Sequence, residues 1–219
     1  MSKSEITTEE KILAKALEMF NERGIEYVGM RELAATLNIR VSNITYYFPT
    51  KDDLVNQLSL ELNNLNSTVF VANENMSVSS FLEMLSNVFR NHVKYRCLLL
   101  SFVHLMEQNK VISVRYKKTE KDRNTVIRSN VKALVKSAYL KVEDESDIEF
   151  LTSTLSLIIR FWISEAAVSH SRLSVQGQIN HYLSMVIKLL SSFSTAKAKK
   201  ELEAFSERLR DSLSPKNGS

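Results

Sequence analysis

The sequence is poor in the residues that make tight turns and cross-links. Its 219 residues include only four glycines, two prolines and one cysteine. A sandwich or barrel of β-strands needs a turn roughly every 8–12 residues, usually with Gly, Asn or Pro, so folds of that kind are excluded. Collagen-like and Pro/Gly-rich disordered chains are excluded as well. The composition therefore predicts an all-α protein.

One cysteine, Cys97, allows neither an internal disulfide nor a cysteine zinc site. Its neighbours are mainly apolar, which favours a buried thiol over a reactive one and suits a reducing cytoplasm. The N-terminus lacks the charged-then-apolar pattern of a signal peptide. The longest apolar runs, such as 155–163, are interrupted by polar residues and fall far short of the roughly 20 residues of a membrane span. The sequence predicts a soluble, cytoplasmic protein without membrane contact.

Charge is distributed unevenly, although the net charge is only +4. Residues 1–55 carry seven Lys/Arg against nine Asp/Glu, which gives −2, whereas residues 110–142 carry ten against two, which gives +8. Bulk charge therefore gives no argument for nucleic-acid binding by the N-terminal part. The basic stretch 110–142 is interpreted as a solvated helix face. The alternative is that it attracts an anionic effector.

Apolar spacing and capping signals predict the helices. Thr7 and Glu10 have the spacing of a capping box, and Gly24 stands where the first helix should end. The expected helices span residues 8–23, 30–37, 41–47, 51–66, 78–95, 97–109, 111–140, 146–171, 175–194 and 196–212. The expected domains are 1–54, a helix-turn-helix domain, and 55–213, a larger helical domain, followed by a disordered tail over 214–219.

The short helix expected at 41–47 has two unlike sides. On a helical wheel, Val41, Ile44 and Phe48 form an apolar side that would be buried, with Thr45 at its edge. The opposite side presents phenol, hydroxyl and amide groups from Ser42, Asn43, Tyr46 and Tyr47. Such groups can bind base edges and phosphates. Periodicity alone also fits plain surface aromatics of a helical bundle.

Residues 7–54 resemble the N-terminal domain of TetR-type transcriptional regulators. The matching segments are 11–20 (KILAKALEMF), 23–24 (RG), 30–34 (MRELA) and 44–54 (ITYYFPTKDDL). The resemblance implies a homodimer that places two recognition helices in successive major grooves of a pseudo-palindromic operator. It further implies a repressor that a small-molecule effector releases from DNA. The DNA-contacting positions it implies are Arg31, Arg40, Val41, Ser42, Asn43, Thr45, Tyr46, Tyr47 and Lys51, with Lys51 on phosphate.

In this family the helical part that follows the DNA-binding domain binds the effector and dimerises. Residues from 55 onward match no family positions, so the expectations for this part rest on the spacing of apolar residues. Apolar stripes on the last long helices suggest a four-helix dimer interface, with filling of the subunit core as the alternative. The interface residues expected are Leu155, Ile159, Ile179, Tyr182, Leu183, Val186 and Leu190. An apolar effector pocket could be lined by Phe89, Phe102, His104, Met106, Tyr116, Phe161 and Trp162, each of which could equally be plain core.

Other function classes have little support in the sequence. It contains no nucleophile elbow, phosphate-binding glycine loop or metal-ligand spacing, so no enzyme, cofactor or metal is expected. A helical adaptor whose helix-turn-helix contacts protein remains an alternative to a DNA-binding regulator. DNA binding that weakens steeply with salt would separate the two.

Overall fold

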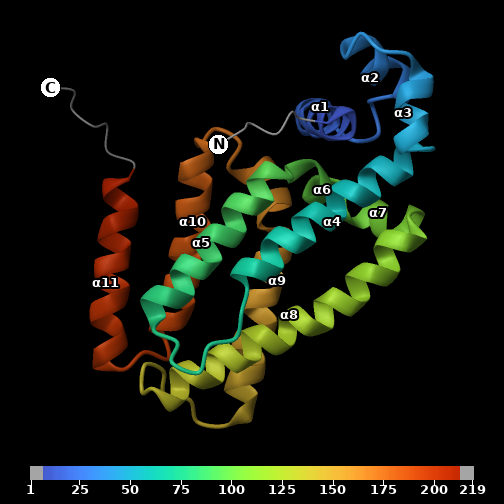
Figure 1. The fold of residues 1–219 in the computed structure, drawn as a ribbon. Helices are drawn as coiled ribbons and strands as arrows, with labels where there is room; N and C mark the ends of the chain where they lie inside the picture. The colour runs from blue at the N-terminus through green and yellow to red at the C-terminus, as the bar shows by residue number, and fades with distance from the viewer. Residues whose placement is uncertain (1–6, 213–219) are drawn as a thin grey trace, which may run out of the picture. The chain divides into compact units, whose positions relative to one another are not determined.

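A computed structural model describes residues 7–212 of the chain, and within that range it contains eleven α-helices and no strand. The helices are α1 (Thr8–Arg23), α2 (Met30–Thr36), α3 (Val41–Tyr47), α4 (Lys51–Val69), α5 (Val78–Lys94), α6 (Arg96–Leu100), α7 (Phe102–Gln108), α8 (Lys110–Lys136), α9 (Glu145–Ser169), α10 (Val175–Ser191) and α11 (Ala196–Asp211) (Figure 1). The all-α prediction is confirmed.

These helices group into two compact units. Among the described residues, unit 1 holds 7–65 and 94–117, and unit 2 holds 66–93 and 118–212. The border expected after residue 54 and the unit border after residue 65 both lie inside α4, and unit 1 also takes in α6, α7 and the start of α8. The tail expected to be disordered, 214–219, lies outside the described residues.

Unit 1 is built on a well-capped first helix. The backbone N–H of Glu10 donates to the Thr7 hydroxyl over 3.2 Å, and the Thr7 N–H donates back to the Glu10 carboxylate over 2.8 Å, which confirms the capping box. Gly24 ends α1 at φ +93°, a conformation that strains any residue with a Cβ. The apolar side of α1 forms the centre of the unit 1 core, with Ile12, Ala16 and Phe20 at 2% exposure or less.

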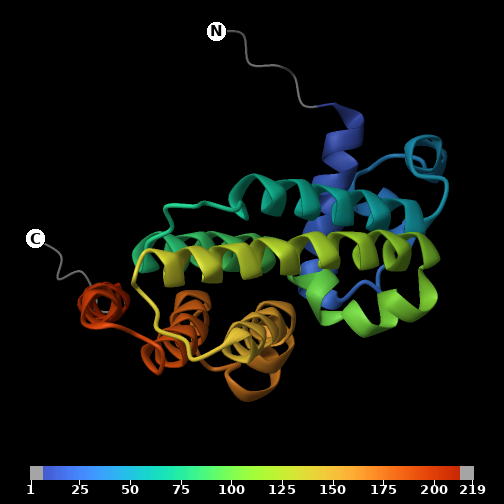
Figure 2. The same ribbon diagram turned by 90° about the horizontal axis from the view of Figure 1, so that it is seen from below.

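Unit 2 packs α9, α10 and α11 with α5 and the second half of α8. Both views show α11 alongside α10, and α9 also packs on α10 (Figure 2). Length and composition alone would let α9 span a membrane, but its side chains Leu151, Leu155 and Ile159 are buried in unit 2, as in the core helix of a globular protein. Trp162 of α9 stacks on Phe89 of α5 with ring centroids 4.7 Å apart.

Several predicted helices differ from the structure in detail, among them the helix expected over 175–194, which ends at Ser191. The segment expected as one helix over 97–109 is divided into α6 and α7 at Ser101. The helix expected to reach residue 140 ends at Lys136, because Ala138 adopts φ +57° and the chain then leaves the helix to make an isolated β-bridge from Leu140 to Ser194. The helix expected to end at 66 continues to Val69.

Candidate nucleic-acid interface

Helices α2 and α3 form a helix-turn-helix in unit 1. α1, α2 and α3 pack against one another, and the chain reverses between α2 and α3 at Asn38. Asn38 has φ +53°, a left-handed conformation that asparagine tolerates better than most residues. The turn sets the direction in which α3 leaves α2, so it determines which face of α3 is exposed.

The anchoring side of α3 is apolar, as predicted. Ile44 is fully buried and Phe48 is 4% exposed, whereas Val41 is only half-buried. Burying a side chain of this size stabilises a fold by roughly 1.5–3 kcal/mol relative to leaving it in water. Two such anchors hold a helix of only seven residues in place, although an isolated helix of that length would not be stable.

The other side of α3 faces solvent. Tyr46 is 81% exposed and Tyr47 40% exposed, and their rings meet edge to face with centroids 5.0 Å apart. Arg31, Arg40, Ser42, Asn43 and Thr45 are also exposed, whereas Lys51 is half-buried. The structure thus gathers the residues expected to face DNA, the half-buried Val41 and Lys51 included, on and around one short helix.

Lys51 begins α4 beside this surface. The preceding Thr50 caps α4, because its hydroxyl accepts from the Asp53 N–H over 3.3 Å and Asp53 Oδ2 accepts from the Thr50 N–H over 2.9 Å. The Lys51 ammonium donates to the Glu26 carbonyl over 3.3 Å, which connects α4 to the α1–α2 turn. A lysine ammonium held at the first residue of a helix is well placed to contact a DNA phosphate.

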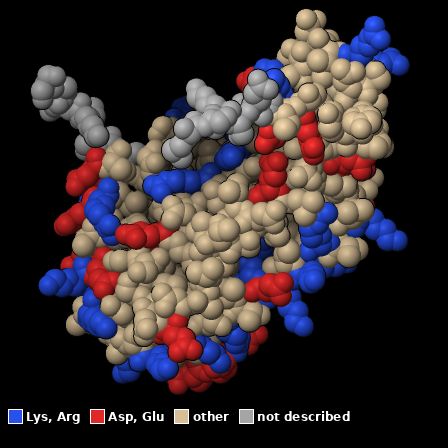
Figure 3. Space-filling view, viewed as in Figure 1, with Lys and Arg blue, Asp and Glu red and all other residues tan. Residues whose placement is uncertain are grey.

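A second connection fixes α2 against the end of α1. The Arg23 guanidinium pairs with the Glu32 carboxylate and also donates to the Tyr27 carbonyl over 3.4 Å. The hydrogen bonds from Arg23 lower the pKa of Glu32. Glu32 therefore stays ionised, with its charge offset by Arg23, and the sequence from Leu33 to Lys51 contains no acid but includes Arg40 and Lys51. In Figure 3 this region is largely uncharged, with Lys and Arg at its outer end.

The residues expected to line an effector pocket fall into different units. Phe102, His104, Met106 and Tyr116 belong to unit 1, where the rings of Phe102 and Tyr116 lie 4.8 Å apart. Phe89, Phe161 and Trp162 belong to unit 2, where Phe89 and Trp162 are buried core residues and Phe161 is half-buried. Two open cavities in unit 2 border α11, and none of these residues lines either of them.

The residues expected at a dimer interface lie inside the single chain. All are at most 3% exposed, and they are Leu155, Ile159, Ile179, Tyr182, Leu183, Val186 and Leu190. A side chain without free surface cannot cover a partner, so the structure places this set in the core of unit 2. In the single chain these stripes are buried faces that pack within the subunit, which is the alternative that the spacing left open.

The structure exposes a different apolar face on the same two helices. Phe150, Leu157 and Val168 of α9 and Met185 of α10 are 45–83% exposed. Sequence reasoning missed them because the broad hydrophobicity of α9 hides which side is outward. The seven-residue spacing of Phe150 and Leu157, opposite the buried stripe, was the signal that could have found them.

The basic stretch 110–142 is partly neutralised in unit 2. Arg128 and Lys132 both pair with Glu145, the latter over 3.0 Å, and together they lower the pKa of Glu145. Arg160 of α9 pairs with Glu120, an acid of the stretch, so this contact joins the two helices without offsetting a basic residue of the stretch. These contacts favour a role for the stretch in joining α8 to α9.

Comparison with known proteins covers both parts of the chain. The family model described as "Bacterial regulatory proteins, tetR family" matches residues 12–58, and the TetR model described as "Bacterial transcriptional repressor" matches residues 63–202. The probable HTH-type transcriptional regulator YttP of Bacillus subtilis (strain 168) is 29% identical over 92 residues, which cover 42% of this chain and 44% of that relative.

Solved structures share the fold. A TetR-family transcriptional regulator from Marinobacter aquaeolei VT8 superposes with a TM-score of 0.85 at 20% identity, over 93% of this chain and 98% of that one. The SmeT–triclosan complex superposes with a TM-score of 0.62 at 13% identity, over 87% of this chain and 93% of that one. At these identities the likeness concerns the fold alone.

Proposed function

Since the chain belongs to the TetR family of bacterial transcriptional regulators and is a DNA-binding protein, we propose that it acts as a homodimeric repressor on a pseudo-palindromic operator in the cytoplasm and that a small-molecule effector releases it. The observation that carries the proposal is the exposed polar side of α3, which presents Asn43, Tyr46 and Tyr47 while Ile44 anchors the helix.

The recognition of DNA rests on that side of α3. An amide and two phenols can exchange hydrogen bonds with base edges, and the aromatic rings can contact thymine methyls. Arg31, Arg40 and Lys51 surround α3 with cations, which would bind phosphates and fix its register in the major groove.

DNA binding is tested by selecting operators from random duplexes and then titrating the best one by fluorescence anisotropy at several salt concentrations. Lys51→Gln should weaken binding and reduce the slope of log affinity against log salt by about one unit for each phosphate that Lys51 neutralises. Lys141→Gln, which removes an exposed cation of unit 2, is the matched control. An affinity insensitive to salt would contradict the proposal and favour a protein-contacting adaptor.

The homodimer proposal rests on the outward apolar face of α9 and α10. Leu157 is 58% exposed in the single chain, and Phe150, Val168 and Met185 share its exposure to solvent. A second copy related by a two-fold axis would cover this face and supply the two α3 helices that a palindrome requires. Burying each large apolar side chain there would contribute roughly 1.5–3 kcal/mol.

Light scattering coupled to size exclusion tests the dimer. Leu157→Lys should convert the dimer to a monomer, because it places a charge in an apolar contact. Val71→Lys is the matched control, since Val71 is 50% exposed on a loop of unit 2. A Leu157→Lys protein of unchanged mass would place the interface elsewhere.

Release by an effector is the remaining part of the proposal. The SmeT structure is a complex with triclosan, so another protein of this fold binds a small molecule. Effector binding in the helical body would change the separation of the two DNA-binding units, so that the half-site spacing no longer fits. Screening compounds for release of the selected operator tests this step.

A further inference from the structure

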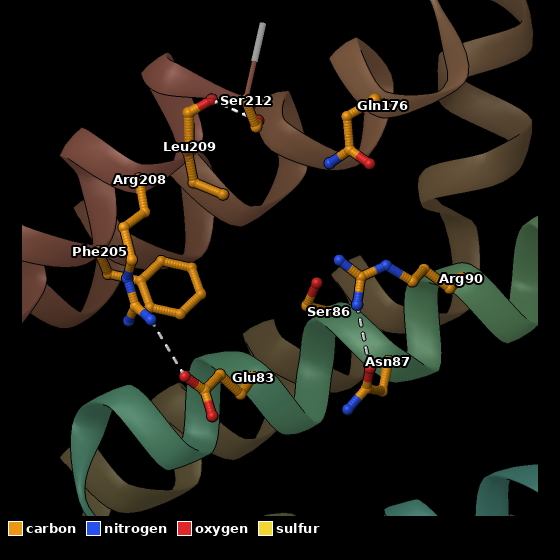
Figure 4. A pocket seen from close by; sticks show the side chains of 9 residues that line it. All are labelled: Glu83, Ser86, Asn87, Arg90, Gln176, Phe205, Arg208, Leu209 and Ser212. Atoms are coloured by element: carbon orange, nitrogen blue, oxygen red, sulfur yellow. Dashed lines mark hydrogen bonds and ion pairs between the residues drawn. The ribbon is translucent and has the colours of Figure 1, made fainter.

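An open cavity of about 370 Å³ lies in unit 2 between α5, α10 and α11 (Figure 4). Polar groups converge on it from three helices, namely the Ser86 hydroxyl and the Arg90 guanidinium of α5, the Gln176 amide of α10 and the Arg208 guanidinium of α11. Phe205 of α11 adds an apolar wall. The cavity involves neither the polar side of α3 nor the outward apolar face of α9.

Arg90 brings to this cavity a positive charge that no carboxylate among the described residues pairs with. Its guanidinium donates to the Asn87 side-chain oxygen over 3.1 Å. Figure 4 shows the guanidinium projecting over the cavity beside Ser86 and toward Gln176. Most of its planar N–H donors therefore remain open to an incoming group.

Arg208 is a second cation with a weakly held partner. Its guanidinium lies 4.7 Å from the centroid of the Phe205 ring and pairs with Glu83 over 3.3 Å. Both side chains of this pair are 58% exposed, and exposed ion pairs hold their partners by no more than about 1 kcal/mol. Arg90, Arg208 and Glu83 together give the lining of the cavity a net charge of +1.

We propose that this cavity binds a small organic oxyanion, a carboxylate or a phosphate carried on a compact apolar body. The Arg90 guanidinium can donate two parallel hydrogen bonds to the two oxygens of such a group, and the Ser86 hydroxyl is a further donor. The Gln176 amide nitrogen already donates to Asn180 Oδ1 over 2.7 Å and has one N–H left for a ligand. Phe205 would contact the apolar body of the ligand. The volume is at the lower end of the roughly 300–1000 Å³ of ligand pockets, which limits the ligand to a small molecule.

Isothermal titration calorimetry on the full chain at low salt tests the proposal with three probes that share an aromatic ring. Benzoate and phenyl phosphate carry the anion, and benzyl alcohol does not. We expect both anions, or one of them, to bind at millimolar concentration and benzyl alcohol not to bind. The anion that binds more tightly identifies the carboxylate or the phosphate as the preferred group. Absence of binding by both anions, or equal binding of the alcohol, would overturn the proposal.

Variants assign any binding to the cavity. Arg90→Gln retains a polar side chain without the charge and should weaken anion binding about tenfold or more, because the neutral amide cannot form a charge-assisted bidentate pair. Glu83→Gln should strengthen it, because Arg208 no longer has a competing carboxylate. Arg172→Gln, a change at an exposed arginine in the α9–α10 loop, is the control. Anion binding that Arg90→Gln leaves unchanged, or that Arg172→Gln weakens equally, would refute the site.

The experiment is independent of the proposed repressor function. The calorimetric result concerns the cavity alone, whereas operator binding is measured separately by anisotropy. A protein that binds benzoate but does not bind DNA would retain the anion site and contradict the repressor proposal. A protein that binds its operator but none of the anions would do the reverse.

Discussion

Protonation of His92 should destabilise unit 2, and the cause of the effect is the burial of the ring. His92 is 4% exposed, and its Nδ1 accepts a hydrogen bond from the Trp162 indole N–H over 3.1 Å. The ring also packs among aromatic side chains, with Phe89 and Trp162 both stacked on it. The Asn66 side-chain nitrogen lies 3.3 Å from the other ring nitrogen, Nε2. A proton on Nδ1 would abolish the acceptor and leave a buried charge without a carboxylate partner among the described residues, so the native state favours the neutral ring.

Burial, with a smaller contribution from the Arg123 charge, lowers the pKa of His92 to about 3 from its ordinary 6.5. The unfolded chain takes up the proton below about pH 6.5, and the native chain does not until about pH 3. The stabilisation is therefore complete above pH 6.5 and decreases as the pH falls through this window. Between about pH 7 and about pH 4.5 the free energy of unfolding should decrease by about 2.5 kcal/mol from this group alone.

Urea denaturation at a series of pH values measures this change. Trp162 is the single tryptophan of the chain and lies against His92, so its fluorescence reports the unfolding of this core. His92→Gln should remove the contribution and flatten the pH profile by about that amount, whereas His104→Gln, a change at an exposed histidine, should leave the profile unchanged.

Parallel pH profiles for the native sequence and His92→Gln would refute the reasoning. If His92→Gln is too unstable to compare, the ring can be followed by NMR in the unaltered protein. A His92 ring resonance that titrates between about pH 6 and 7 would equally contradict a depressed pKa.

Three further predictions concern buried groups. Asn130→Ala should reduce the free energy of unfolding by about 2 kcal/mol, because the buried Asn130 amide holds the Val71 carbonyl and the Asn73 N–H, and urea denaturation against the exposed Lys136→Ala checks it. Burial raises the pKa of Cys97 to about 12, so iodoacetamide should modify it only as fast as the protein opens; rapid alkylation of the native protein would contradict this. Ile44→Ala should lower both stability, by roughly 2–5 kcal/mol, and operator affinity, whereas Tyr46→Ala should lower affinity alone, as paired melting and anisotropy experiments would show.

Local sequence signals were sufficient to predict features that depend on contacts between residues a few positions apart. The capping boxes of Thr7 and Thr50 join residues three apart, and Asn38 needs only its own backbone preference to adopt φ +53°. The two faces of α3 follow from a period of 3.6 residues, since Ile44 and Phe48 are four apart. Helix positions and the candidate DNA-contacting side could therefore be predicted, and the resemblance of residues 7–54 to a known domain agreed with them.

Long-range contacts could not be predicted in the same way. The pairing of His92 with Trp162 joins residues 70 apart, and the bonds from Asn130 reach back by 57 and 59 residues. Periodicity identified Leu155 and Leu183 as members of buried stripes, but only their complete burial in one chain shows that they pack within the subunit. The spacing of apolar residues within a helix does not indicate which other helix its apolar stripe packs against.

The amino-acid sequence by itself determined the class of protein, because scarce turn residues, helical periodicity and a locally encoded helix-turn-helix act over a few residues at a time. The tertiary structure alone decided which apolar faces remain exposed, which arginine of the cavity lacks a carboxylate partner within the described part of the chain, and where a cavity opens beside α11. Those properties depend on which surfaces meet when helices far apart in the chain pack together. The hydrophobic effect is non-directional, so the spacing of apolar residues in one helix does not reveal which other helix will cover it.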